Sequence, residues 1–493
     1  MSLAKSAVRG ALWTLLENLS SQLSSFVLFL VFARLIEPKA IGLVQVAITL
    51  YSFLTIFVEH GFTTTVIRNR TLPPSALNTA FWMSVSGGTA IAIGLCLSAN
   101  HVSSAYRIPE LTPVLRVMAW CIPITTLGVI QSAVLTRELA FRTQAVRRLF
   151  AVAGGGIVGV ALAFNGFGAW ALVARFVVET SIYSAIAWMW SPWSPGITVS
   201  KADAREFVSF ASRVAGAYII SFLNRRVDDF VVGLVLGPAV LGFFAVATRG
   251  IVLVTEVALR AAQRTAMPIF SRLQDQPERL RAAYYDALEF AVALASPVFV
   301  GMAAVANELT FTLFGARWAP VVPAMSVLGF SGIAVAVSAF NIPVLIATGR
   351  PTWLFYLSVI EAVLSVTSSV VAARWGLLAV ATAYVVRSYL VVPIGLFLIR
   401  ESLGIRFWHI LKLVYPPALA SIAMVGMAAL FRTLCHTFSP PVRLLLLTSV
   451  GGVTYVSVMM LTARTTVERL FRLARGVRNA SVPPSNSPAA RVS

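Results

Sequence analysis

The chain has 493 residues, of which 58% are hydrophobic and only 12% are charged, and its mean hydropathy is +0.84. A soluble globular protein carries about 25% charged residues, so this composition excludes a soluble protein. Apolar runs of roughly 20 residues, each long enough to cross a bilayer core of about 30 Å, recur along nearly the whole length. We therefore expect an all-helical, multi-pass membrane protein, whose first apolar segment is too long for a cleaved signal peptide.

The net charge of +20 would suggest a nucleic-acid partner in a soluble protein. Here the excess of Lys and Arg is concentrated in alternate connections between the apolar runs, as the positive-inside rule describes for cytoplasmic loops, so no nucleic-acid partner is expected. Cys96, Cys121 and Cys435 lie in or beside apolar runs without metal-ligand spacing. They are predicted to be packing residues, with neither a disulfide framework nor a metal site.

The apolar runs predict about fourteen membrane spans. They cover residues 11–36, 41–66, 77–99, 113–136, 146–165, 169–191, 207–235, 239–263, 284–306, 323–347, 352–373, 377–399, 409–432 and 442–463. If the N-terminus is cytoplasmic, the inside connections hold most of the Lys and Arg residues and the outside connections hold far fewer. Both termini are therefore predicted to be cytoplasmic.

Polar segments divide the chain into lobes. The Pro-rich segment 191–196 is the natural linker between halves, and residues 267–283 predict a short cytoplasmic amphipathic connection. We expect an N-terminal lobe over residues 1–200, a C-terminal lobe over 201–405, two added spans over 406–463 and a tail over 464–493. The tail is predicted to begin as a basic amphipathic helix on anionic lipid and to end as a disordered segment.

One short motif occurs twice, 200 positions apart. Pro38 and Gly42 after the first span recur as Pro238 and Gly242 after the seventh, within matching apolar residues. A second motif is also repeated: Gly168-Ala169-Trp170-Ala171 recurs as Gly376-Leu377-Leu378-Ala379. Pro and Gly also mark ordinary tight turns, but two repeated motifs in register favour an internal duplication. Because each repeat has six spans, the repeats have the same orientation, and transporters of this kind place their pathway between the halves.

The seventh span carries the most polar stripe. At helical spacing it presents Arg213, Ala217, Ser221, Asn224, Arg225 and Asp228, with Arg226 and Asp229 beside them. The stripe predicts either the lining of a substrate cavity or a self-neutralising cluster that locks helices together, since Arg225 and Arg226 can reach the aspartates. Arg213 has no acidic neighbour on its helix, which favours the cavity.

Other spans add ionisable groups, which are costly in the hydrocarbon region and therefore face an interior or water. Glu17 and Gln22 in span one and Arg249 in span eight are further cavity candidates. Candidates for coupling to a proton or sodium gradient are Glu59, His60, Glu361 and Arg387, although Glu59 and His60 also fit a solvated helix end. Arginine exceeds acid within the spans, which indicates an anionic cargo because guanidinium pairs bidentately with phosphate and carboxylate.

The sequence contains no enzymatic constellation. The sequence lacks an HExxH motif, a Cys/His metal cluster and a GxSxG elbow. It also lacks a Walker loop, which coupling to ATP would need. We therefore expect neither catalysis nor a cofactor.

These residues resemble those of the bacterial polysaccharide transporters. The similarity lies in Arg34-Leu35-Ile36-Glu37-Pro38, Leu241-Gly242-Phe243-Phe244, Pro268-Ile269-Phe270-Ser271-Arg272-Leu273 and Phe314-Gly315-Ala316-Arg317-Trp318, and it covers about residues 10–400. The transporters are the O-antigen, colanic-acid and succinoglycan-type flippases of the multidrug/oligosaccharidyl-lipid/polysaccharide exporter superfamily. Asp229 departs from the family pattern, which more often has a neutral polar residue there.

The resemblance implies a flippase of the bacterial inner membrane that moves an undecaprenyl-diphosphate-linked oligosaccharide between leaflets. It implies alternating access of two lobes, with membrane lipid, a polysaccharide polymerase and export machinery as partners. Two alternatives stay open. A multidrug antiporter of the same superfamily would usually need an acidic pocket, and a membrane polysaccharide polymerase would be expected to have a large periplasmic loop.

The topology is testable with reporter fusions. Fusions after Arg148 and after Ser493 should both report a cytoplasmic location, because the alternation of Lys and Arg places both sites inside. A periplasmic signal at either site would contradict the topology.

Overall fold

The computed structural model describes residues 20–68 and 72–469, and every regular element within them is helical. Twelve helices in this part of the chain are long and apolar enough to span a membrane, and the bent pair Ala316–Leu328 and Ser331–Ala347 makes a thirteenth. A shorter apolar helix, Ser20–Leu35, holds the described part of the first predicted span. The predicted multi-pass, all-helical architecture is confirmed.

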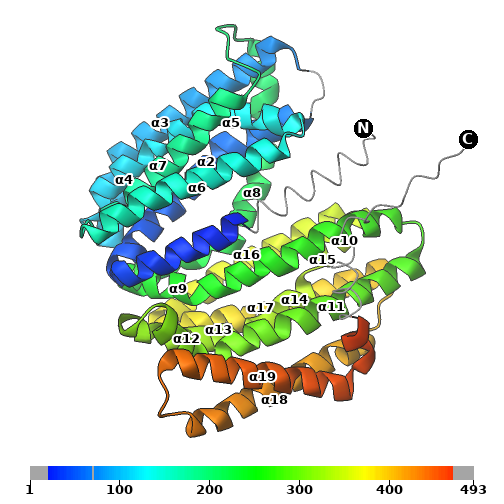
Figure 1. Ribbon diagram of the computed structural model, residues 1–493. Coiled ribbons are helices and arrows are strands. Elements are labelled where there is room, and N and C mark those ends of the chain that lie inside the picture. Colours follow the sequence, from blue (N-terminus) through cyan, green and yellow to red (C-terminus); the bar gives the residue numbers. More distant parts are fainter. Residues whose placement is uncertain (1–19, 69–71, 470–493) are drawn as a thin grey trace, which may run out of the picture.

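The N-terminal lobe contains the helix Ser20–Leu35 and six labelled helices, drawn in blue to cyan-green at the top of Figure 1. These are α2 (Pro38–Arg68), α3 (Pro74–Tyr106), α4 (Leu111–Ala119), α5 (Cys121–Arg137), α6 (Phe141–Phe164) and α7 (Ala169–Trp190). Pro38 and Pro74 begin their helices because a first-turn residue needs no intrahelical N–H bond. The fourth predicted span is divided at Trp120 into α4 and α5.

The C-terminal lobe repeats this plan. Its helices are α8 (Lys201–Leu236), α9 (Pro238–Val254), α10 (Arg260–Arg272), α11 (Pro277–Ala304), α12 (Ala306–Leu313), α13 (Val322–Leu328), α14 (Ser331–Ser338), α15 (Asn341–Ala347), α16 (Pro351–Ala372) and α17 (Leu377–Leu403). A π-helical turn joins α9 to α10. The tenth predicted span is divided into α13, α14 and α15, just as the fourth is divided. Gly168 and Gly376, from the second repeated motif, each precede a helix at positive φ.

The two Pro–Gly turns meet at the interface between the lobes. A Cβ atom on Gly42 would overlap the carbonyl oxygen of Pro238, and one on Gly242 would overlap that of Pro38. The contact is reciprocal, as in a two-fold interface between identical subunits. Both prolines therefore lie at the same end of the molecule, as a parallel repeat requires.

Further contacts seal this end of the interface. The Nε1–H of buried Trp318 donates to the carbonyl of Ala33 at 2.7 Å, and Arg34 donates to the carbonyls of Thr312 and Leu313. The core here is continuous between the lobes, since Phe32 of the first helix packs in the same cluster as Val246 of α9.

Helix α8 crosses between the lobes. Its first turns pack on the N-terminal lobe, where Phe207 lies against Phe62 and Ala211 leaves no room for a Cβ on Gly61. Its last turns join the shared core through Val232. Figure 1 shows α8 running from the upper lobe toward the lower one. Span seven, which the sequence assigns to the C-terminal lobe, is thus in contact with both lobes.

Helices α18 (Phe407–Leu434) and α19 (Pro440–Thr462) pack on α11 and α12 at the bottom of Figure 1. Arg432 of α18 pairs with fully buried Glu308 of α12 at 3.0 Å. The start of the tail also docks on protein: Arg469 pairs with Asp286 at 3.2 Å, and Val467 is buried. The rest of the tail lies outside the described residues.

The structure shows the form of the connection predicted over residues 267–283. It continues α10 to Arg272, turns, and begins α11 at Pro277, because Pro277 occupies a first-turn position where proline is favoured. Only the turn between Arg272 and Pro277 is non-helical.

Substitution of Gly42 tests the contact between the lobes. Gly42→Ala should destabilise the protein by about 1–3 kcal/mol, because the added methyl group overpacks a backbone contact. Gly94→Ala is the matched control, since a Cβ there meets nothing within 4 Å. Thermal unfolding of the purified variants measures the effect. Equal melting of the two variants would show that the lobes do not pack closely at Gly42.

Candidate functional site

Arginines from both lobes form a group that we call the arginine cluster. Its members are Arg148 of α6, Arg175 of α7, Arg225 and Arg226 of α8, Arg249 of α9 and Arg260 of α10. Arg175 and Arg226 lie close enough to repel the charge on Arg249, so the cluster extends across the interface. Charged groups within membrane spans lie in protein interiors or at water-filled cavities. Arg225 and Arg226 are exposed, which fits a cavity.

Three carboxylates neutralise part of the cluster. Asp229 pairs with Arg226 at 3.1 Å, and Glu256 pairs with Arg260 at 3.0 Å. Glu179 lies between Arg148 and Arg175, at 3.5 and 3.6 Å. Asp229 also accepts a hydrogen bond from Gln45 of α2 at 3.2 Å, and this bond links the lobes.

Two arginines of the cluster form no ion pair at 4.0 Å or less with a described residue. The guanidinium of Arg249 lies 5.0 Å from the ring centroid of Phe29 and forms no ion pair there. Arg225 uses Nε to donate to the Ser221 carbonyl at 3.2 Å. With six arginines and three acids, the cluster has an excess of positive charge. It therefore offers bidentate donors to an anion such as phosphate or carboxylate.

Asp228 and Arg387 form a different kind of site. They make a bidentate pair at 3.0 and 3.2 Å, and they are only 5% and 7% exposed. Ser369 of α16 donates to the same carboxylate. The pair joins α8 to α17 and α16, and both of its charges are satisfied by protein groups. Asp228, predicted to line the cavity, is therefore engaged by Arg387 and Ser369 and forms no ion pair with a described member of the arginine cluster.

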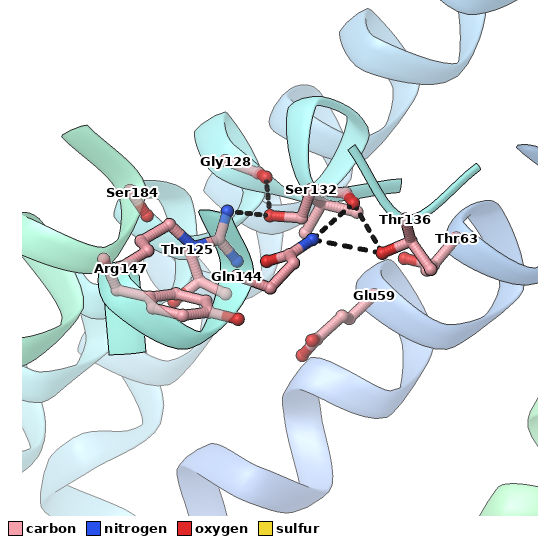
Figure 2. Close-up of a pocket in the computed structure, with 11 residues that line it drawn as sticks. Glu59, Thr63, Thr125, Gly128, Ser132, Thr136, Gln144, Arg147 and Ser184 are labelled. Atoms are coloured by element: carbon pink, nitrogen blue, oxygen red, sulfur yellow. Dashed lines mark hydrogen bonds between the residues drawn. The ribbon is translucent and has the colours of Figure 1, made fainter. Parts of the chain in front are cut away.

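The N-terminal lobe contains a polar pocket of about 310 Å³ between α2, α5, α6 and α7 (Figure 2). Glu59 of α2 and Arg147 of α6 both line it, and Arg147 is fully buried. The guanidinium of Arg147 lies 3.7 Å from the ring centroid of Tyr183 and donates to Ser132 Oγ at 2.9 Å. Figure 2 draws no hydrogen bond between the Glu59 carboxylate and the other residues of the pocket.

A second polar pocket, of about 250 Å³, lies in the C-terminal lobe. Its lining includes Asn224, Gln263, Glu361, Tyr384 and Arg387. The sequence predicts Asn224 for substrate and Glu361 and Arg387 for coupling, and the structure brings these three together. Both pockets lie within single lobes and draw on corresponding spans of the two repeats.

The structure thus separates the predicted site residues into groups. Arg225, Arg226 and Arg249 lie in the arginine cluster, Asp228 is in the buried pair, and Glu59 is in the N-terminal pocket. Gln22 lies on the helix Ser20–Leu35 and is partly exposed. Glu17 and the side chains of His60 and Arg213 lie outside the described residues.

Sequence reasoning missed Arg147 and Arg148. The positive-inside rule counts both as cytoplasmic residues, at the very start of the span predicted over 146–165. Helix α6 begins at Phe141 instead, which brings Arg147 and Arg148 inside the bundle. Gln144 is the sequence feature that could have indicated this. It lies one helical turn before Arg147 and Arg148 and therefore on the same face of the helix.

Comparison with curated proteins shows relatives named for polysaccharide transport and biosynthesis. The chain is 26% identical to the succinoglycan biosynthesis transport protein ExoT of Rhizobium meliloti, and the match covers 97% of this chain and 98% of that protein. It is 22% identical to the teichuronic acid biosynthesis protein TuaB of Bacillus subtilis, over 96% and 99% of the two chains.

Comparison with solved structures shows the same fold. A structure of the lipid II flippase MurJ in an inward closed conformation is similar with a TM-score of 0.75 and 13% identity, over 94% of this chain and 99% of that one. An inward-facing multidrug transporter of the superfamily is similar with a TM-score of 0.59 and 15% identity, over 79% and 98%. The fold is that of the multidrug/oligosaccharidyl-lipid/polysaccharide exporters.

The family comparison covers the region that holds the whole arginine cluster and much of the core. The family described as "Polysaccharide biosynthesis protein" matches residues 31–323, which is more than half of the chain. Together with the helical fold and the transporters among its relatives, this match shows that the chain is a membrane protein of the polysaccharide biosynthesis family.

Proposed function

We propose that the protein is a flippase that moves a lipid-linked oligosaccharide, carried on a diphosphate, across the bacterial inner membrane. The observation that carries this proposal is the arginine cluster, in which Arg225 and Arg249 form no ion pair at 4.0 Å or less with a described residue. A diphosphate suits these guanidinium groups because charge-assisted hydrogen bonds to them are strong and directional. The relatives named for succinoglycan and teichuronic acid support a saccharide cargo.

Transport would proceed by alternating access between the lobes. The reciprocal contact of the Pro–Gly turns closes one end of the interface. If the N-terminus is cytoplasmic, this end is periplasmic, and the cargo enters from the cytoplasmic side. The diphosphate then binds among the arginines while the lipid tail stays in the bilayer. Opening the other way requires the contacts of Gly42, Gly242 and Trp318 to separate.

An ion gradient would supply the energy, with protons as the simplest choice. Glu59 and Glu361 are carboxylates in membrane spans, each in a polar pocket within one lobe. Neither forms an ion pair at 4.0 Å or less with a described residue. Each carboxylate can therefore exchange a proton without breaking a direct salt bridge.

Arg249 separates the anion-binding hypothesis from a structural one. Arg249→Ala should lower polysaccharide export by about 10- to 100-fold, since a hydrogen bond to a charged group contributes about 1.5–3 kcal/mol. Arg249→Lys should restore export only in part, because lysine offers a point charge without the planar fork. Export is measured by complementation of a strain that lacks the gene, normalised to the amount of protein in the membrane. Normal export by both Arg249→Ala and Arg213→Ala would refute the anion site.

The buried ion pair of Asp228 and Arg387 is expected to contribute to stability. Asp228→Leu or Arg387→Met alone should cost about 3–5 kcal/mol of stability, because each leaves a buried charge without its partner. The double variant should recover most of that loss. Thermal unfolding and membrane abundance are the measurements. If the single variants fold normally and lose only export, Asp228 and Arg387 would belong to the transport site.

A further inference from the structure

The N-terminal pocket contains hydrogen-bond donors that no described residue satisfies. Nε and Nη2 of Arg147 are fully buried without a partner, whereas Nη1 donates to Ser132. Nε and Nη2 lie along one edge of the guanidinium plane, which is the geometry that binds the two oxygens of one carboxylate. A buried arginine with an open edge is costly, and Glu59, the carboxylate that lines the same pocket, accepts no hydrogen bond from it.

No described group around the pocket accepts a hydrogen bond from Nε or Nη2 of Arg147, and several of the nearby donors are used elsewhere. Ser132 donates to the Gly128 carbonyl at 2.5 Å, and Thr136 donates to the Ser132 carbonyl at 2.8 Å. Thr125 donates to the Cys121 carbonyl at 2.9 Å. Gln144 uses its amide hydrogens for Ser132 and Thr136 (Figure 2). Among the described residues that line the pocket, Arg147 is the one whose fully buried nitrogens have no partner.

We propose that this pocket is a binding site for a small monovalent oxyanion of the carboxylate or bicarbonate class. The anion accepts hydrogen bonds from Nε and Nη2 of Arg147, above the ring of Tyr183. The volume of about 310 Å³ holds such an anion together with several waters, each of which occupies roughly 30 Å³ in the liquid. The site is separate from the arginine cluster and does not depend on the proposed cargo.

Glu59 makes the binding dependent on pH. The charged groups near the pocket are Glu59 from α2, Arg147 and Arg148 from α6, and Glu179 from α7, where Glu179 is already paired with Arg148. Helix α5 contributes only neutral groups to the lining, and Tyr183 of α7 is the remaining titratable one. Ionised Glu59 attracts Arg147 and repels an anion, whereas protonated Glu59 does neither. Proton uptake and anion uptake therefore favour each other, and anion affinity rises as the pH falls.

The test uses the purified full-length protein and sodium acetate as the probe. Thermal unfolding is recorded against acetate concentration at pH 6 and pH 8, with sodium chloride at equal ionic strength as the reference. Wild type should show saturable stabilisation by acetate that chloride does not reproduce, with tighter binding at pH 6. Glu59→Gln, which mimics the protonated acid, should bind acetate more tightly at pH 8 and lose the pH dependence.

The arginine variants locate the site. Arg147→Gln should weaken acetate binding by about tenfold or more, as expected for the loss of a charge-assisted pair. Arg148→Gln is the matched control: its guanidinium bonds Ser21 and Glu179 and does not line the pocket, so binding should change by less than about threefold. If Arg147→Gln fails to fold, the acetate affinity of Glu59→Gln at pH 8 decides whether the proposal holds.

Three results would overturn the proposal. These are equal effects of acetate and chloride on wild type, unchanged acetate binding in Arg147→Gln, and unchanged affinity at pH 8 in Glu59→Gln. Glucuronate then distinguishes two sources of the same chemistry. If it competes with acetate, the natural ligand is a sugar carboxylate; if it does not, the ligand is a free anion. Either outcome is consistent with the oxyanion site. Export by Arg249→Ala tests the proposed function separately, so the two proposals can fail independently.

Discussion

The structure depends on the contact of Gly42 with the Pro238 carbonyl and of Gly242 with the Pro38 carbonyl. Only residues without a side chain let two helix starts approach this closely. The approach brings α2 and α9 together and aligns the shared core around Phe32 and Val246. Because each glycine contacts the partner repeat's proline, the duplication itself creates the interface. The relative position of the arginines in the two lobes follows from it.

The charged side chains within the spans form two classes: those that pair with an oppositely charged protein group and those that do not. Asp228 and Arg387, both buried, neutralise each other at 3.0 Å, which fixes α8 to the C-terminal lobe. Arg249 has a phenylalanine ring and like charges around it instead. The cost of an unpaired charge in a membrane span is offset only if water or an anion reaches it. Pairing therefore separates structural arginines from functional ones better than position in the sequence does.

Helix α8 connects these two regions. Its first turns pack on the N-terminal lobe through Phe207, and its last turns belong to the core that both lobes share through Val232. Arg225 and Arg226 lie between these anchored ends. A relative movement of the lobes must bend α8 or release one end, and either change would move these two arginines. The helix that presents arginines to the proposed cargo is thus the helix that a lobe movement deforms.

The sequence by itself determined the helical class and the approximate spans, because hydrophobic length is a local property, and its repeated Pro–Gly motif predicted a duplication. It also indicated Arg225, Arg226 and Arg249 as charges within spans. Only the tertiary structure decided which charges are paired. Asp228 finds Arg387, 159 positions away, and Arg147 is enclosed because it packs on Tyr183 of α7 and Ser132 of α5. Partner choice depends on how helices pack across the bundle, and helical periodicity contains no information about the neighbouring helix.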